Sequence, residues 1–380
     1  MKCHAWVSAA TLLLLACSTP DREEGAETAA SSQPQEREEP GRTLSDPAPD
    51  TDGVVRALLY YDMEGLSGQD DPRSIFYRER DPYTRARELL TADVNAAVEG
   101  LFAGGADEVH VVDAHGSGNP EPDVLLDKMD SRARLVVRDT PFAPYVDLVE
   151  AGVYDAVAVV GMHSRTGAGG FASHTYTLGM DIILNGSSVT ETEIIGYSWG
   201  RVDVPVVFAA GDDRLQGNLS TMPWIVFVRV KDATSASTAE LRPVDEVHQE
   251  MRAGAERALR GRASARAMKL TTPVRAALRA VPPARLDMLE GVPGIDYRDQ
   301  TVSFQADDFR AAYDGVIALI NVARGGYGDV LNEYLREADP SVLAGYSSYL
   351  AGRWWDVESG RWTRPPRREP EPGRKYHGAS

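Results

Sequence analysis

Cysteine is nearly absent from this chain of 380 residues, which contains only Cys3 and Cys17. Both lie at the extreme N-terminus, so the remaining sequence has no thiol for disulfides or for thiolate metal ligands. A metal bound to the folded part of the chain must therefore be held by nitrogen and oxygen atoms.

Net positive charge is also lacking. The chain has 40 Lys and Arg against 57 Asp and Glu, a formal charge of −17. This balance argues against binding to nucleic acid, whose phosphates require a basic surface, and it fits poorly with an anionic membrane surface. The hydrophobic fraction of 43% and charged fraction of 26% are typical of a soluble globular protein.

Long hydrophobic runs are missing as well, apart from an apolar stretch at residues 5–16 that follows Lys2. It is too short to span a bilayer but suits a signal peptide. It ends in Leu14-Leu15-Ala16-Cys17, which resembles a bacterial lipobox. We therefore expect residues 1–17 to be a lipoprotein signal peptide and Cys17 to be lipidated, which would anchor the protein in the bacterial cell envelope. If the cell is Gram-negative, the expected place is the outer membrane or the periplasmic face. The alternative is an ordinary cleaved signal or an uncleaved anchor.

Composition divides the rest of the chain into four regions. Residues 18–52 are rich in Glu and Pro and are expected to form a flexible acidic tether. Residues 53–217 are expected to form an α/β metal-binding catalytic domain, and residues 218–325 a smaller α+β lobe. Residues 326–380 are a C-terminal extension with a basic, proline-rich tail, and the part after about residue 350 is expected to be disordered.

Strand-like and helix-like patterns alternate through the expected catalytic domain. The runs that predict strands are 54–61, 108–112, 135–138, 156–160 and 204–209, and residues 84–102 have helical periodicity. This alternation favours an α/β fold with a mostly parallel sheet. Asn185-Gly186 predicts a local hairpin. Beyond it, strands are expected at 224–230, 275–280 and 301–305, and helices at 244–259 and 309–322.

Two carboxylates follow the first predicted strand, at Asp62 and Glu64. Ligands of a parallel sheet gather at the carboxyl ends of its strands. In extended chain these two side chains point the same way, so they repel each other unless a cation lies between them. The sequence therefore indicates a metal site here, and a solvated turn is the alternative.

Three of the seven histidines follow other strand-like runs: His115, His163 and His174. Imidazole and carboxylate ligands without thiolate suit zinc or another first-row divalent ion. His174 follows a glycine-rich segment and is a candidate ligand or proton-transfer group. Ordinary hydrogen-bonded histidines are the alternative.

Further carboxylates offer weaker candidates. Glu191 and Glu193 follow the hairpin, and either would supply another ligand. Asp212 and Asp213 end another strand and are better explained as a turn with a structural cap.

Several motifs occur together in an order that resembles the zinc-dependent D-aminopeptidases of the dipeptide-transport-operon type. They are Asp62-Met63-Glu64-Gly65-Leu66-Ser67-Gly68, Asp113-Ala114-His115-Gly116, Gly161-Met162-His163, Ser173-His174, Asn185-Gly186, Asp203-Val204-Pro205-Val206, Ala210-Gly211-Asp212-Asp213, Phe304-Gln305-Ala306 and Ala312-Tyr313. The resemblance extends over about residues 54 to 322.

The resemblance implies an α/β domain with a smaller α+β lobe, two zinc ions in each subunit and a homo-oligomer. Asp62 would bridge the ions and His174 would be the catalytic histidine. The other ligands would form one pair for each ion: Glu64 with His163, and His115 with Glu191. Glu193 is the alternative to Glu191.

The expected function is a metal-dependent aminopeptidase that hydrolyses short peptides with N-terminal D-amino acids of the D-Ala type. The ions would polarise the scissile carbonyl and activate water, and His174 would act as acid and base, oxyanion stabiliser or nucleophile. Two other functions remain open: a two-metal phosphoesterase, for which Arg165 and Arg214 are the nearby cations, and a non-catalytic peptide-binding lipoprotein.

Overall fold

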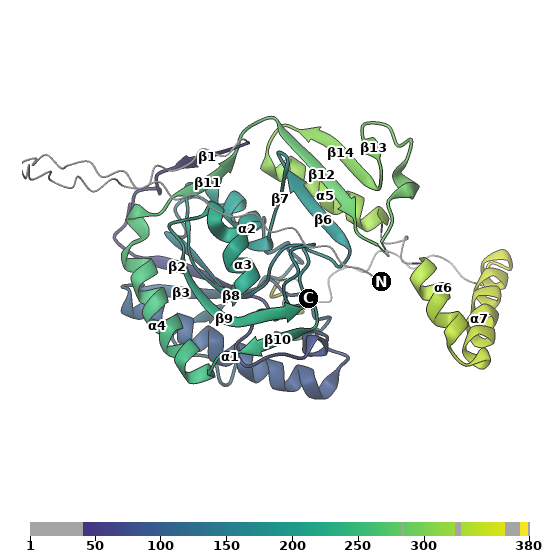
Figure 1. Ribbon diagram of the computed structural model, residues 1–380, viewed down its shortest axis with the longest axis horizontal. Coiled ribbons are helices and arrows are strands. Elements are labelled where there is room, and N and C mark those ends of the chain that lie inside the picture. The colour runs from purple at the N-terminus through teal and green to yellow at the C-terminus, as the bar shows by residue number, and fades with distance from the viewer. Residues whose placement is uncertain (1–40, 283, 324–327, 362–372, 379–380) are drawn as a thin grey trace, which may run out of the picture. The chain divides into compact units, whose positions relative to one another are not determined.

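A seven-stranded sheet is the central element of the computed structural model, which describes residues 41–282, 284–323, 328–361 and 373–378 (Figure 1). In spatial order its strands are β10 (Thr238–Leu241), β9 (Val226–Ser235), β8 (Val206–Asp212), β5 (Ala156–Met162), β2 (Arg56–Tyr61), β3 (Glu108–Asp113) and β4 (Arg134–Leu135). All neighbours are parallel except β9 and β10. The predicted mostly parallel sheet is confirmed.

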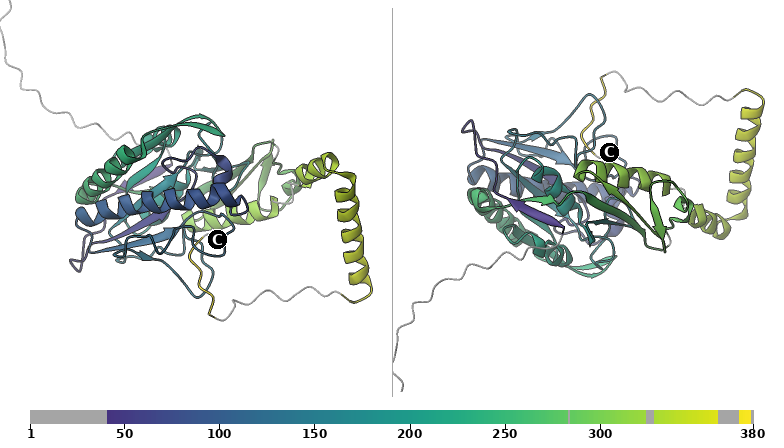
Figure 2. Two further views of the ribbon diagram at one scale, coloured as in Figure 1. Left: turned by 90° about the horizontal axis from the view of Figure 1, so that it is seen from below. Right: turned by 90° about the horizontal axis from the view of Figure 1, so that it is seen from above.

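Two long helices, α1 (Arg80–Ala103) and α4 (Val244–Arg260), pack together and share a hydrophobic core with one face of this sheet (Figure 2). Their apolar residues recur at helical spacing and meet the side chains that alternate strand residues direct to this face. A Cβ at Gly100 would lie 2.3 Å from the carbonyl oxygen of Arg252. Glycine is therefore required where the two helices approach most closely.

The opposite face packs against α2 (Glu191–Gly200) and the smaller lobe. This lobe is an antiparallel sheet in the order β13 (Asp296–Arg298), β14 (Thr301–Ala306), β12 (Val274–Ala280), β6 (Met180–Leu184) and β7 (Ser187–Ser188), together with α5 (Phe309–Ala323). The hairpin predicted at Asn185-Gly186 joins β6 to β7. Trp199 of α2 donates a hydrogen bond to the buried hydroxyl of Tyr60, 2.9 Å away, and so ties α2 to β2.

The sheets do not divide at the expected boundary near residue 217. β9, β10 and α4 come after that position but belong with the large sheet, whereas β6 and β7 come before it and belong to the small sheet. Strand partners are chosen across long sequence separations, for example β6 with β12, and composition does not encode that choice.

The acidic tether is ordered in part, contrary to expectation. β1 (Arg42–Ser45) pairs antiparallel with β11 (Ala267–Leu270), and the side chain of Asn185 donates to the carbonyl oxygen of Gly41 at 2.7 Å. The predicted signal peptide, Cys17 and the tether up to residue 40 lie outside the described residues.

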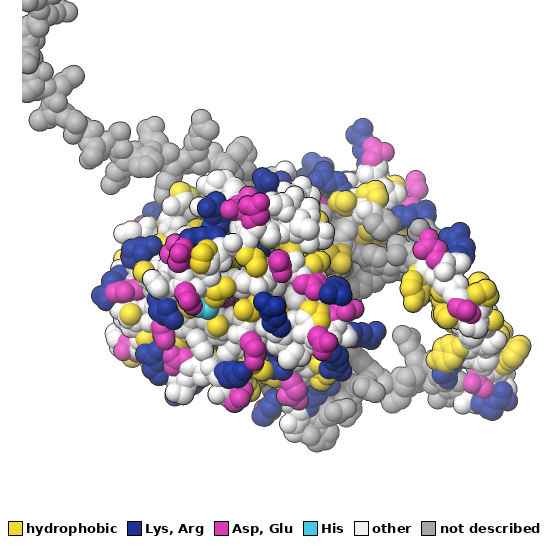
Figure 3. All heavy atoms as spheres, turned by 60° about the horizontal axis from the view of Figure 1, so that its bottom comes forward, with side chains coloured by type: hydrophobic (Ala, Val, Ile, Leu, Met, Phe, Trp, Pro, Cys, Tyr) yellow, Lys and Arg dark blue, Asp and Glu magenta, His cyan; other side chains and the backbone are white. Residues whose placement is uncertain are grey.

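The expectation of disorder after about residue 350 is also wrong for residues 351–358, which form the end of a helix. α6 (Gly328–Glu337) is followed by α7 (Pro340–Glu358), and hydrophobic and charged side chains are both visible on the surface of this part of the chain in Figure 3. No described residue of α7 is buried, and the large side chains of Trp354 and Trp355 are both exposed. The proline-rich part of the tail, residues 362–372, lies outside the described residues.

The remaining elements are short. They are α3 (Asp213–Asn218) and the 3-10 helices η1 (Pro72–Ile75), η2 (Leu219–Thr221), η3 (Arg262–Ser264) and η4 (Asp287–Leu289). Among the helices of the described ranges, none combines the length and the apolar character that crossing a bilayer requires.

Candidate metal centre

Two glycines bring the ends of neighbouring strands β2 and β5 into contact. The N–H of Gly65 donates to the carbonyl of Gly161 at 2.7 Å. A Cβ at Gly65 would lie 1.8 Å from the oxygen of Met162, and one at Gly161 would lie 2.0 Å from the oxygen of Asp62. Gly161 also has a φ of +71°, which favours glycine. The glycines of both motifs are therefore required by the close approach of the two backbones that carry the acidic and imidazole side chains.

The carboxylates of the first motif are almost fully buried, with 2% of Asp62 and 1% of Glu64 exposed. The Oδ1 atom of Asp62 accepts a hydrogen bond from the N–H of Met63 at 2.8 Å. Burial of two neighbouring carboxylates is unfavourable unless positive charge compensates them. The imidazoles of His115, His163 and His174 surround these carboxylates.

His115 reaches these carboxylates from the end of β3. Its Nε2 lies 2.8 Å from the carbonyl oxygen of Ile75, so Nε2 carries a proton. Its Nδ1 lies 2.9 Å from Asp62 Oδ1 and 3.3 Å from Glu64 Oε2. A neutral ring would direct a lone pair at two anions, so positive charge is needed here, either as a second ring proton or as a bound cation.

The two other histidines repeat this arrangement. Nδ1 of His163 lies 3.0 Å from the carbonyl oxygen of Ser164, and Nδ1 of His174 lies 2.9 Å from that of Ala172. Both Nε2 atoms therefore face the carboxylates: that of His163 lies 3.6 Å and that of His174 lies 3.8 Å from Glu191 Oε1. The two rings stack with centroids 4.2 Å apart. His174 is the most exposed of the three, at 14% of its side chain.

Ionisation in the cluster reflects the same charge balance. Burial alone would raise the pKa of Asp62, but the neighbouring imidazoles of His115 and His163 outweigh it and hold that pKa well below its usual range. Burial lowers the pKa of His163, but Glu191, Asp62 and Glu64 outweigh that effect and raise the pKa to about 10. Asp62 thus remains charged and stabilises a cation placed beside it.

A divalent metal ion fits this donor set. The Nε2 of His163 is buried and, within the described residues, makes no hydrogen bond, although it lies 3.4 Å from Asp62 Oδ2. Each imidazole is oriented by a backbone carbonyl, as metal-ligating histidines generally are. Three groups have ligand atoms within 4.8 Å of one another: Asp62–Glu64–His115, Asp62–His163–Glu191 and Glu64–His163–His174.

These groups bear on the expected ligand pairs. Asp62 and Glu64 each belong to two of them, so either carboxylate has the position that a shared ligand needs. Glu64 lies in a group with His115 and in another with His163, whereas Glu191 lies in a group with His163 and not with His115. The geometry therefore brings all the expected ligands together but does not reproduce the expected pairing of His115 with Glu191.

The structure distinguishes the two glutamates that sequence reasoning left open. Glu191 is the first residue of α2, and its oxygens accept hydrogen bonds from the Tyr145 hydroxyl at 2.5 Å and the Tyr176 N–H at 2.7 Å. Glu193 points away from the histidines and forms a capping box with Thr190, which is a recognised N-terminal signal for a helix. Only Glu191 is therefore available to the cluster.

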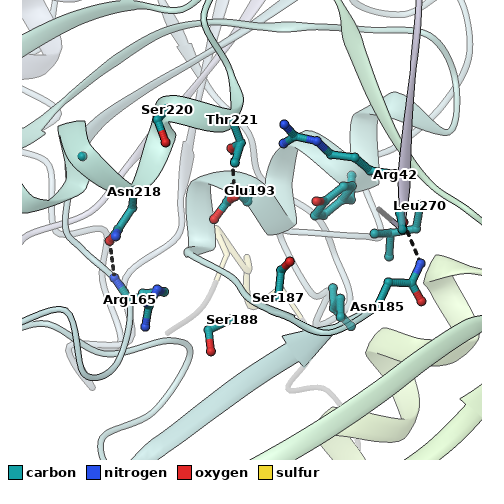
Figure 4. Close-up of a pocket in the computed structure, with 14 residues that line it drawn as sticks. Arg42, Arg165, Asn185, Ser187, Ser188, Glu193, Asn218, Ser220, Thr221 and Leu270 are labelled. Atoms are coloured by element: carbon teal, nitrogen blue, oxygen red, sulfur yellow. Dashed lines mark hydrogen bonds between the residues drawn. The ribbon is translucent and has the colours of Figure 1, made fainter. Parts of the chain in front are cut away.

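Glu193 instead lines a separate polar cavity of about 230 Å³ (Figure 4). Thr221 donates to its Oε1 at 3.0 Å. Arg42 and Arg165 line the same cavity, and Arg165 also donates to the carbonyl oxygen of Thr166 at 3.0 Å. Arg214 pairs with Asp213. Arg165 and Arg214, the cations that a phosphoesterase would need, thus make contacts away from the cluster. These contacts do not support phosphate binding at the cluster.

Asp212 has the expected structural role as a cap. Its Oδ1 accepts from the N–H of Leu215 at 2.7 Å and so caps α3. Its Oδ2 accepts from the N–H of Phe171 at 3.0 Å, which anchors the glycine-rich segment before His174.

Sequence reasoning missed two residues that support the cluster, Tyr145 and Lys231. Tyr145, which binds Glu191, lies in an irregular segment with no motif of its own. Lys231 is fully buried in β9, and its Nζ donates to the carbonyl oxygens of Glu64 at 2.7 Å and Gln69 at 2.8 Å. It also lies 4.3 Å above the ring of Phe171. A lysine within an apolar strand pattern is the only sequence signal for this contact.

Comparisons with known proteins agree with this arrangement. Residues 55–318 match the sequence model of a peptidase family, M55, described as D-aminopeptidase. A D-aminopeptidase of Bacillus subtilis (strain 168) is 27% identical over 277 residues, which cover 71% of this chain and 98% of that protein. The structure of the Zn-dependent D-aminopeptidase DppA from Bacillus subtilis, described as a self-compartmentalizing protease, has a similar fold. Its TM-score is 0.64 at 23% identity, over 71% of this chain and 98% of that one.

Proposed function

Because the chain belongs to the D-aminopeptidase family of peptidases, M55, we propose that its buried cluster is a dinuclear zinc centre that cleaves short peptides with an N-terminal D-amino acid. The orientation of the three imidazoles carries this proposal. Each has one ring nitrogen on a backbone carbonyl and the other directed at carboxylates. A pair of divalent ions supplies the positive charge that this arrangement requires.

The proposed ligands are Asp62, Glu64, His115, His163 and Glu191. Asp62, Glu64 and His163 are each common to two of the three possible ligand groups. Of these, Asp62 would be the carboxylate shared by the two ions, as the family resemblance implies. Bound zinc would supply Lewis-acid chemistry and a nucleophile at neutral pH. The protein's own contribution is to hold the donors rigidly, since Gly65 and Gly161 fix the backbone beneath them.

His174 is the proposed catalytic residue. It is the most accessible of the three imidazoles, and the Ala172 carbonyl holds its proton on Nδ1. Its Nε2 therefore faces the carboxylates of Glu64 and Glu191. This atom would accept a proton from the water that attacks the peptide carbonyl and would donate that proton to the leaving amine when the C–N bond breaks.

Metal analysis and turnover of the purified full chain test this function. We expect two zinc ions in each chain, and faster hydrolysis of D-alanine p-nitroanilide than of the L-enantiomer. Removal of metal by a chelator should abolish turnover, and zinc should restore it. Less than one transition-metal ion per chain would contradict the metal centre, whereas equal turnover of both enantiomers would contradict only the preference for D-residues.

Assembly and location are further parts of the proposal. We propose a homo-oligomer, which light scattering would reveal as a mass that is a multiple of the mass of one mature chain. We also propose that Cys17 is lipidated and anchors the protein in the bacterial cell envelope, supported by the preceding Leu14-Leu15-Ala16. Cys17→Ser should abolish incorporation of labelled fatty acid and release the protein from membranes. Unchanged labelling would contradict lipidation at this residue.

A further inference from the structure

The last described residues of the chain, 373–378, return to the end of the large sheet, and we call them the C-terminal clip (Figure 2). Tyr376 and Arg138 exchange backbone hydrogen bonds of 2.7 and 2.8 Å. Gly378 forms a second bridge, with Asp113 at the end of β3. The clip lies far beyond residue 318, where the match to the family model ends. It is therefore an addition of this chain to the surroundings of the metal centre.

The contact between the clip and β3 is close enough to select the residue type. A Cβ at Gly378 would lie 2.1 Å from the carbonyl oxygen of Asp113, and its φ is +141°. No other residue fits without displacement of the strand end. Such a close contact indicates that the clip binds at a specific position on the end of β3.

His377 brings a side chain to the same strand end. It is 4% exposed, and its Nδ1 lies 3.4 Å from Oδ2 of Asp113. Its Nε2 lies 3.3 Å from the carbonyl oxygen of Pro120. Within the described ranges, Asp113 Oδ2 is fully buried and has no hydrogen bond. The imidazole of His377 is thus the side chain of the clip that faces this buried carboxylate oxygen.

Asp113 connects the clip to the metal centre. Its Oδ1 accepts a hydrogen bond from the backbone N–H of His115 at 2.8 Å. His115 in turn directs its Nδ1 at Asp62 and Glu64. A displacement of Asp113 therefore changes the position of the His115 backbone and, with it, the direction of its ligand atom.

We propose that the C-terminal clip is a positioning element of the active site, in which His377 acts through Asp113 to orient His115. This inference rests on the proposed function, because it assigns His115 to the metal. A positioning contact beyond the direct ligands commonly changes metal affinity or activity by about 10- to 100-fold. The clip supplies such a contact from a segment more than 200 residues away in sequence.

Three variants test the proposal: His377→Ala, a chain ending at residue 372, and Lys375→Ala as a matched control. Lys375 lies in the clip but pairs with Asp139 through side chains that are 60% and 79% exposed. Such a pair contributes little in water. Zinc affinity is measured by competition with a chromogenic chelator, kcat and KM by steady-state hydrolysis, and the fold by circular dichroism.

We expect His377→Ala and the truncated chain to bind zinc about 10- to 100-fold more weakly and to lose kcat with little change in KM. Lys375→Ala should match the wild type. A synthetic peptide of residues 373–380 should restore zinc affinity to the truncated chain. Wild-type affinity and kcat in a folded His377→Ala protein would overturn the positioning role and leave the proposed function intact.

A metal-independent measurement separates this inference from the proposed function. In protein with isotopically labelled histidine, the His115 ring signals in metal-free samples should shift in His377→Ala but not in Lys375→Ala. If the wild type bound no zinc, the proposed function would fail while this shift still tested the contact. Unmoved His115 signals would overturn the inference directly.

Discussion

Replacing Glu191 and Glu193 separately by glutamine provides the sharpest test of the metal centre. The two residues are two positions apart in the first turn of α2, and both are almost fully buried. Each substitution removes one negative charge and preserves the shape of the side chain. The structure nevertheless predicts opposite outcomes, because the two carboxylates have different neighbours.

Glu191→Gln should damage the metal centre. One oxygen of this carboxylate lies 3.6 Å from His163 Nε2, and both accept hydrogen bonds, from Tyr145 and Tyr176. An amide placed there would lose the charge and direct an N–H at one of these donors. Since supporting contacts alone change metal affinity by about 10- to 100-fold, loss of a ligand should exceed about 100-fold. We expect zinc content to fall from two ions to one in each chain, and kcat to fall by about 100-fold or more.

Glu193→Gln should affect stability only. The glutamine oxygen can still accept from the Thr190 N–H, which is 2.8 Å from Oε2, and the amide N–H can donate to the Thr221 hydroxyl. Burial raises the pKa of Glu193, so a neutral side chain is tolerated there. The free energy of unfolding should change by less than about 1 kcal/mol, the usual size of a capping effect. In a chain of this size that shifts Tm by about 2–4 °C at most.

The assay combines zinc analysis, steady-state kinetics and thermal unfolding on the wild type and both variants under one condition. Loss of zinc in Glu193→Gln, with full zinc in Glu191→Gln, would reverse the ligand assignment. Full zinc content in both variants would refute the idea that a glutamate of α2 binds metal.

Three other substitutions are informative. Gly161→Ala should lower the free energy of unfolding in urea by about 2–4 kcal/mol, because its Cβ meets the carbonyl oxygen of Asp62 just after β2. Gly169 has a similar φ of +74° but lies in open space, so Gly169→Ala should lower it by only about 1 kcal/mol. Equal losses of stability would contradict the clash. His174→Ala should reduce kcat by about 10²- to 10⁴-fold with zinc content unchanged, and loss of zinc would make it a ligand instead. Lys231→Met should cost about 2 kcal/mol, because two carbonyl oxygens lose their donor. Burial lowers the pKa of Lys231 from 10.5 to about 7. The unfolded wild type therefore binds more protons than the folded protein between those values, so its stability relative to Lys231→Met should rise with pH; a flat difference would contradict this titration.

The sequence predicted most of the central elements because their signals are local. β2, β3 and β5 are short runs of apolar residues, and α1 and α4 repeat apolar residues at helical spacing. α2 was missed, although Thr190 and Glu193 form a capping box that can be read from the sequence. β1 was missed because an acidic, proline-containing segment carries little strand signal without its partner β11.

Residue types and motif order alone were enough to indicate the chemistry of the site. With no thiol after Cys17, a metal could be held only by nitrogen and oxygen, and Asp62, His115 and His163 each follow a buried strand. In a parallel sheet such positions share one edge, so their convergence follows from local structure. The family resemblance then distinguished the enzyme class, and the comparison over residues 55–318 agrees with it.

Only the tertiary structure decided which groups support the site, because those contacts join segments far apart in the chain. It directed Glu191 to the histidines and Glu193 to a helix cap. It brought Lys231 beneath Glu64 and His377 onto Asp113, across separations of 167 and 264 residues. Local sequence favours a residue's secondary structure and its side of a strand. Long-range packing decides which residues become its neighbours, and those neighbours set the charge and orientation of the buried cluster.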